Sequence, residues 1–142
     1  KLFTGNNCGA GEFGMIDYLD QCYEYYASGQ FFLNVYGISG EVVYQQAIEG
    51  NKDALRMYEE QGTHLGNAIK MILYAYDVEL IVLGGWAGKA FPFFSTAMWN
   101  RIKTFIFKRS VNKLLVKVSE LKNSGILGAA ALYYDRHNIK IS

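Results

Sequence analysis

The sequence predicts an α/β domain that is rich in helix and contains a small, largely parallel sheet. In the second half of the chain, short apolar runs typical of strands alternate with helical patterns, which is the order of a parallel crossover unit. In the first half almost every pattern is helical, so the sheet has few strands for the amount of helix around it. We therefore expect that sheet partners are missing from these residues.

Length and composition fit an ordinary folded domain. The chain has 142 residues, of which 51% are hydrophobic and 19% are charged, and its net charge is +1. A chain of this size buries roughly two thirds of its unfolded surface. No apolar run reaches the ~18 residues of a membrane helix. We expect no membrane association, and the two cysteines fit a reduced, cytoplasmic setting.

Charge is divided unevenly along the chain. Residues 1–79 contain 4 basic and 11 acidic side chains, a net charge of −7, whereas residues 80–142 contain 10 and 2, a net charge of +8. Because the basic side chains are spaced rather than clustered, pairing with the acidic half is favoured over binding to nucleic acid.

Glycines and capping residues divide the first half. Residues 1–15 include four glycines and two asparagines and are expected to form a loop. We expect Asp17 to cap a helix that ends near Gly29, and a second helix to begin after Ser39 and stop at Gly50.

The longest predicted helix follows Asn51, its expected cap. Gly62 and Gly66 each cost about 1 kcal/mol relative to Ala in a helix interior, so we expect another backbone to pack closely against them. The apolar or small positions of this helix step by threes and fours: Leu55, Tyr58, Gly62, Leu65, Ile69, Ile72 and Tyr76.

Two strands and two helices are predicted in the second half. Leu80–Leu83 suits a strand buried on both faces. A helix is expected from about Phe91 to Phe107, with Pro92 in its first turn. The alternating pattern of Leu114–Ser119 predicts a second strand, and a last helix begins near Ser124.

A pair of glycines, Gly84 and Gly85, follows the first of these strands and precedes a helix. Open α/β sheets bind ligands at this place, where backbone amides can contact a nucleotide. The pair does not belong to a GxGxxG fingerprint, and Gly88-Lys89 lacks the other residues of a P-loop. A plain tight turn is the equal alternative.

Two acidic residues lie near the glycine-rich loop. Glu12 is within it, and Glu24 follows twelve residues later. Such carboxylates can accept hydrogen bonds from sugar hydroxyls, although solvated surface acids are commoner. His64 and His137 have no metal ligands at suitable spacing and are expected to be surface or capping residues. No nucleophile or zinc site with four ligands is encoded.

Four motifs occur in a fixed order: GAGEFGM (Gly9–Met15), CYEYYASG (Cys22–Gly29), ELIVLGG (Glu79–Gly85) and LGAAAL (Leu127–Leu132). Together with the long helix between them, they resemble the ROK family of bacterial sugar kinases and sugar-responsive repressors. The resemblance implies the RNase H-like half of an actin-like ATPase fold, in which two domains close over ATP and sugar.

The resemblance also implies roles for single residues. Glu12 matches the Glu of the family's GEIGH loop, with Gly11 beside it, and Glu24 matches the Glu of its CLE segment; these bind the sugar. Gly84 and Gly85 match the glycines that border the adenine and ribose site. The implied ligands are a hexose and ATP with Mg²⁺.

Three positions depart from the family pattern. Met15 replaces the His that ends the GEIGH loop, where it contacts the sugar and commonly binds zinc. Of the family's zinc cysteines only the last is matched, by Cys22, so we expect no zinc. Trp86-Ala87 follow the glycine pair where many members have smaller residues.

The family's general-base Asp and phosphate-binding loop match nothing in this sequence and belong upstream of Lys1. We therefore interpret residues 1–142 as a partial C-terminal domain of an ATP-dependent hexose kinase of the glucokinase type. Its N-terminal lobe and catalytic residue are absent, so the isolated chain is expected to be inactive, and family analogy adds a homodimer. The alternatives are the sugar-sensing domain of a ROK repressor, which binds DNA through another domain, and a helical interaction domain without a ligand.

Overall fold

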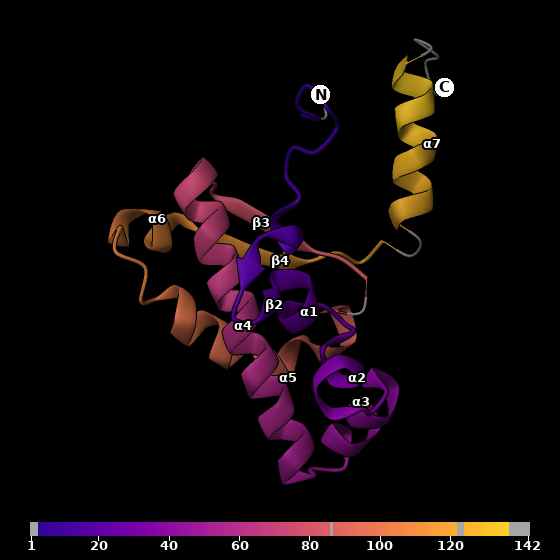
Figure 1. The fold of residues 1–142 in the computed structure, drawn as a ribbon, viewed down its shortest axis with the longest axis vertical. Helices are drawn as coiled ribbons and strands as arrows, with labels where there is room; N and C mark the ends of the chain where they lie inside the picture. The colour runs from indigo at the N-terminus through magenta and orange to yellow at the C-terminus, as the bar shows by residue number, and fades with distance from the viewer. Residues whose placement is uncertain (1–2, 86, 122–123, 137–142) are drawn as a thin grey trace.

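The computed structural model describes residues 3–85, 87–121 and 124–136 (Figure 1). Within these ranges the sequence forms helices, one 3₁₀ turn and two small sheets of two strands each. The elements in chain order are η1 (Phe13–Met15), β1 (Asp17–Tyr18), β2 (Gln21–Cys22), α1 (Tyr23–Ala27), α2 (Phe31–Tyr36), α3 (Gly40–Ile48), α4 (Lys52–Tyr76), β3 (Leu80–Leu83), α5 (Ala87–Ile102), α6 (Lys108–Lys113), β4 (Leu115–Val118) and α7 (Ser124–Arg136).

The packing of α4 against α5 forms the centre of the molecule (Figure 1). Both predicted helix glycines lie in this contact. A Cβ atom at Gly62 would overlap the carbonyl oxygen of Phe94, and one at Gly66 would lie 2.7 Å from the carbonyl oxygen of Met98. The predicted close backbone packing is therefore confirmed. Aromatic and aliphatic side chains from α2 to α5 complete the core: Phe31, Phe32, Val43, Tyr58, Ile69, Leu73, Phe94, Met98 and Ile102.

The predicted cap of α4, Asn51, is confirmed, and α3 begins after Ser39 as expected, with Ser39 as its cap. The Ser39 hydroxyl accepts a hydrogen bond from the backbone N–H of Val42 at 3.3 Å. The Asn51 side chain accepts from the backbone N–H groups of Asp53 and Ala54 at 2.9 and 3.1 Å. These oxygens satisfy amides that have no partner inside the helix.

The prediction that Asp17 caps a helix is wrong. Asp17–Tyr18 forms β1, which pairs antiparallel with β2, and Leu19 in the turn between them has a left-handed backbone with φ of 57°. The helix begins only at Tyr23. Aromatic packing explains the difference, because the hairpin lets the Tyr18 ring stack on Tyr23 with centroids 4.2 Å apart.

Other helix boundaries also differ from those expected. The helix that contains Pro92 begins at Ala87 and ends at Ile102, so Pro92 lies in its interior and not in its first turn. Ala90, in the turn before Pro92, is buried. The short helices α2 and α6 were not predicted, since neither is long enough to show a helical period.

The strands β3 and β4 pair in parallel, as predicted, with Leu80 opposite Leu115. The prediction that β3 is buried on both faces is wrong for this chain. Ile81 and Leu83 pack on the core, but Leu80 and Val82 are 50% and 56% exposed. Within the described residues, the helices cover one face of this sheet and leave the other exposed.

The last helix, α7, begins at Ser124 as predicted. Figure 1 shows it standing apart from the body formed by α1 to α6. All its described side chains, from residue 125 to 134, are exposed. The exposed apolar ones include Ile126, Leu127 and Leu132.

Candidate functional site

The glycine-rich loop and α1 bring Glu12 and Glu24 to one region. Glu12 caps the 3₁₀ turn η1, and Gly14 within that turn lies so close to α1 that a Cβ there would be 3.2 Å from Oε2 of Glu24. Both side chains are exposed, and in the described chain neither carboxylate has a hydrogen bond or an ion pair. Two unpaired carboxylates are thus available to an external ligand.

Backbone geometry fixes this loop. Gly11 has φ of 91°, a left-handed conformation that other residues rarely adopt, and open space surrounds the place where its Cβ would be. The backbone N–H of Tyr23 donates to the carbonyl of Ile16 at 3.1 Å and closes the base of the hairpin. The Phe13 ring contacts Tyr76, with centroids 5.6 Å apart, so η1 rests on the end of α4.

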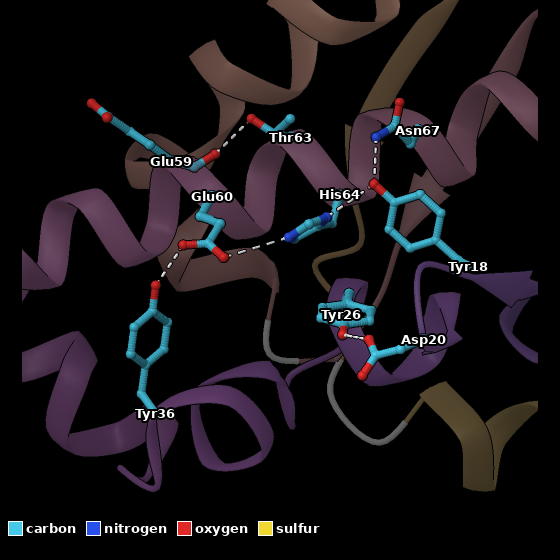
Figure 2. Close-up of polar contacts among 9 residues, drawn as sticks. All are labelled: Tyr18, Asp20, Tyr26, Tyr36, Glu59, Glu60, Thr63, His64 and Asn67. Atoms are coloured by element: carbon cyan, nitrogen blue, oxygen red, sulfur yellow. Dashed lines mark hydrogen bonds and ion pairs between the residues drawn. The ribbon is translucent and has the colours of Figure 1, made fainter.

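His64 is not the surface or capping residue that the sequence predicted. Its side chain on α4 is only 12% exposed and lies against the rings of Tyr18, Tyr26 and Phe31. Figure 2 shows Tyr18 and Tyr26 near it. Nδ1 lies 3.1 Å from the hydroxyl of Tyr18. Burial lowers the pKa of His64 from its ordinary value of 6.5, although the nearby Glu60 carboxylate acts in the opposite direction.

The helical period explains where His64 points. It stands three residues after the fully buried Gln61 and four before the buried Ala68, on the inner face of α4. The apolar stripe of the sequence therefore contained a usable indication of its burial. His137, the other histidine, is outside the described residues.

Side chains from four elements extend the contacts of His64. Asn67 donates a hydrogen bond to the Tyr18 hydroxyl at 2.6 Å and accepts one from Nε of Arg101 on α5. On the other side of the ring, Oε1 of Glu60 lies 3.7 Å from Nε2, and Oε2 of Glu60 accepts from Tyr36 at 2.5 Å (Figure 2). Sequence reasoning missed this set of residues.

The predicted nucleotide contact, Gly84 and Gly85, lies at the junction between β3 and α5. Gly85 has φ of 67°, so this turn requires a glycine. A cavity of about 430 Å³ opens beside the first turn of α5, lined there by Lys89 and Ala90. Its other walls include the aromatic side chains of Phe32, Tyr44 and Tyr58.

The described ranges contain no group of three His, Cys, Asp or Glu side chains placed to hold a metal ion. Cys8 is exposed, Cys22 is half-buried, and both thiols are free. No helix in the part of the chain that the structure describes has the length and apolar character needed to cross a bilayer.

The fold is that of sugar kinases and related regulators. It superimposes with a TM-score of 0.77 on a proposed sugar kinase from Cytophaga hutchinsonii, at 24% identity over 94% of this chain and 51% of the other. The TM-score is 0.78 for a ROK family transcriptional regulator, a homolog of the Escherichia coli MLC protein. The identity is 22%, over 92% of this chain and 39% of the regulator. For a ROK hexokinase from Thermus thermophilus the TM-score is 0.71, at 18% identity over 96% of this chain and 52% of the hexokinase.

The model of the ROK family matches residues 1–136, so the chain belongs to the ROK family. It spans about half the length of the two kinase structures and less of the regulator. A search among curated proteins finds no match.

Proposed function

We propose that this chain supplies the sugar-binding loop and the adenosine side of the ATP site in an ATP-dependent hexose kinase, as the C-terminal, RNase H-like half of an actin-like ATPase fold. The observation that supports this best is the placement of Glu12 and Glu24. The glycine-rich loop and α1, which pack closely at Gly14, present two exposed, unpaired carboxylates in a member of the ROK family, to which a hexokinase also belongs.

The two carboxylates suit a polyol. An ionised carboxylate is an acceptor only, and each can take hydrogen bonds from two adjacent hydroxyl groups. Two of them on different elements fix the orientation of the sugar ring as well as its position, which directs one hydroxyl towards the phosphoryl donor. The general base that takes the proton of this hydroxyl would come from outside residues 1–142.

The residues present fit the adenosine part of ATP. A cavity of about 430 Å³ lies within the usual size of small-ligand sites, and its aromatic lining suits a purine base. The left-handed turn at Gly85 leaves room for a ribose to approach the backbone. The described chain offers no cluster of three metal ligands, so Mg²⁺, which neutralises charge during transfer, would be held by phosphate oxygens.

A sugar-sensing repressor domain is the second candidate, because the ROK transcriptional regulator matches this fold as well as the kinases do. Glu12 and Glu24 would then bind an effector sugar without phosphorylating it. A cytoplasmic location and a homodimer complete the proposal on the basis of family analogy.

An ADP-release assay on the whole gene product, with a panel of hexoses that includes N-acetylated ones, tests the proposal. Sugar-dependent ADP release supports the kinase. Saturable sugar binding by calorimetry without ADP release supports the sensor. Absence of both contradicts the sugar site and favours a helical interaction domain.

A further inference from the structure

A line of hydrogen bonds connects the core helices to the β1–β2 hairpin, which is the segment between Glu12 and Glu24. We call it the Tyr18 network: Arg101, Asn67, Tyr18 and His64, with Glu60 at its end. Figure 2 shows Tyr18 reaching from the hairpin to the side chains of His64 and Asn67 on α4. Tyr18 is thus a polar anchor of the hairpin on the core.

Arg101 determines the orientation of the Asn67 amide in this network. A guanidinium group donates and cannot accept, so the Asn67 atom facing it must be the carbonyl oxygen, Oδ1. The amide nitrogen of Asn67 then donates to the Tyr18 hydroxyl. The Tyr18 hydroxyl still has a lone pair and its one proton for its other neighbour, Nδ1 of His64, so the direction of this bond follows the tautomer of the imidazole.

The neutral tautomer with its proton on Nε2 leaves Nδ1 of His64 able to accept from Tyr18. The charge around the ring favours the same tautomer, because Nε2 faces the Glu60 carboxylate at 3.7 Å, and a lone pair there would be repelled. This separation is too long for a hydrogen bond, and Nε2 is buried without another partner. The contact with Glu60 compensates only partly for burying a charged imidazole.

Among the residues that the structure describes, no further charged side chain forms a hydrogen bond or an ion pair with His64. Tyr26 on α1 lies against the ring, with centroids 5.1 Å apart, but its hydroxyl donates to Asp20. Phe31 on α2 offers only an apolar ring. Tyr36, which is also on α2, donates its hydrogen bond to Glu60 and not to His64. Arg101, on α5, acts on the ring through Asn67.

We propose that neutral His64 is a positioning residue for the Glu12–Glu24 site, and that its protonation releases the hairpin and weakens sugar binding. Protonation adds a hydrogen to Nδ1, at the place now occupied by the proton of Tyr18. The hydroxyl would then receive hydrogen bonds from both Asn67 and His64, and its own proton would have no acceptor in the network. The link to sugar binding rests on the proposed function.

Hydrogen exchange of the amides of residues 12–24 in the whole gene product tests the network without any ligand. We expect protection factors to fall about fivefold between pH 7.5 and pH 5, because opening the hairpin gives water access to the charged imidazole that Tyr18 and Tyr26 otherwise cover. In His64→Asn, Oδ1 can accept from Tyr18 but does not titrate, so protection should stay high at both pH values. In Tyr18→Phe, it should be low at both. Tyr25→Phe, which removes a tyrosine hydroxyl bonded to Asn34 instead, is the matched control and should behave like the wild type.

Sugar affinity, measured by calorimetry at the same pH values, provides the second measurement. We expect the Kd for the hexose to rise about fivefold at pH 5 in the wild type and to be independent of pH in His64→Asn. Protection that does not depend on pH, or that depends on it equally in His64→Asn, would overturn the proposal. The proposal would also be overturned if protection of the hairpin amides falls at pH 5 while the Kd for the hexose stays constant. If the hairpin responds to pH but no hexose binds at any pH, the proposed function fails and the positioning role fails with it, while the network itself stands.

Discussion

Tyr18 and His64 are 46 positions apart in the sequence, yet the Tyr18 hydroxyl lies 3.1 Å from Nδ1 of His64. This contact joins the hairpin, which the sequence did not predict, to the helix that it predicted best. It also places a neutral, buried imidazole beside the loop of the candidate site, which gives the folded state a dependence on pH.

The free energy of unfolding should fall as pH drops below 6.5. Burial lowers the pKa of folded His64 from this ordinary value, so between the two values the unfolded chain binds more protons than the folded one. The stabilisation from the neutral ring is complete above pH 6.5 and is lost as pH falls towards the lowered pKa. Urea unfolding of the gene product at several pH values measures this. His64→Asn should flatten the slope in this window, and an unchanged slope would assign it to other groups.

Glu12→Gln and Glu24→Gln should each raise the sugar KM about tenfold or more, with a much smaller change in the KM for ATP. The substitution replaces an acceptor-only carboxylate by an amide, and a hydrogen bond to a charged group contributes roughly 1.5–3 kcal/mol. Steady-state kinetics with both substrates varied provides the measurement. Glu49→Gln, in an exposed residue at the end of α3, is the matched control. Equal effects on both substrates would contradict the sugar role.

Gly66→Ala should destabilise the protein by about 1–3 kcal/mol, because the new methyl group would lie 2.7 Å from both the Arg101 side chain and the Met98 carbonyl. Gly128→Ala is the control: it lies in α7 with nothing near its Cβ position and should be neutral or stabilising by up to about 1 kcal/mol. Denaturant midpoints of the two variants distinguish close packing from simple helix propensity. Similar effects of the two substitutions would contradict the packing argument.

The sequence predicted the features that depend on local chemistry. Asn51 caps α4 and α3 begins after Ser39 as expected, since a capping side chain needs only the next few amides. The parallel pairing of β3 and β4 followed from the order of elements. The hairpin at Asp17 and the burial of His64 could not be predicted with the same certainty, because both depend on aromatic rings from distant segments.

The candidate site, like the fold, could be predicted only where it depends on local sequence. Glu12 and Glu24 were singled out from motifs, and the contact between their segments depends on Gly14, which has no side chain to keep η1 away from α1. The roles of Gly84 and Gly85 remain predictions. The aromatic cavity at the first turn of α5 is built from α2, α3, α4 and α5, and no single segment of the sequence indicates it.

Val82→Asp tests whether the sheet is larger in the whole gene product. Val82 and Leu80 on β3 and Leu115 on β4 are all at least half exposed in this chain. If the chain is half of a larger fold, as proposed, other strands or helices cover this face, and an Asp there would be buried without a partner. We then expect a loss of about 3 kcal/mol or more in the free energy of unfolding of the gene product. Ile48→Asp, a residue exposed to the same 56% at the end of α3, should cost about 0.5 kcal/mol. Equal, small effects of the two substitutions would show that the face of β3 and β4 stays in solvent, and would contradict the half-fold.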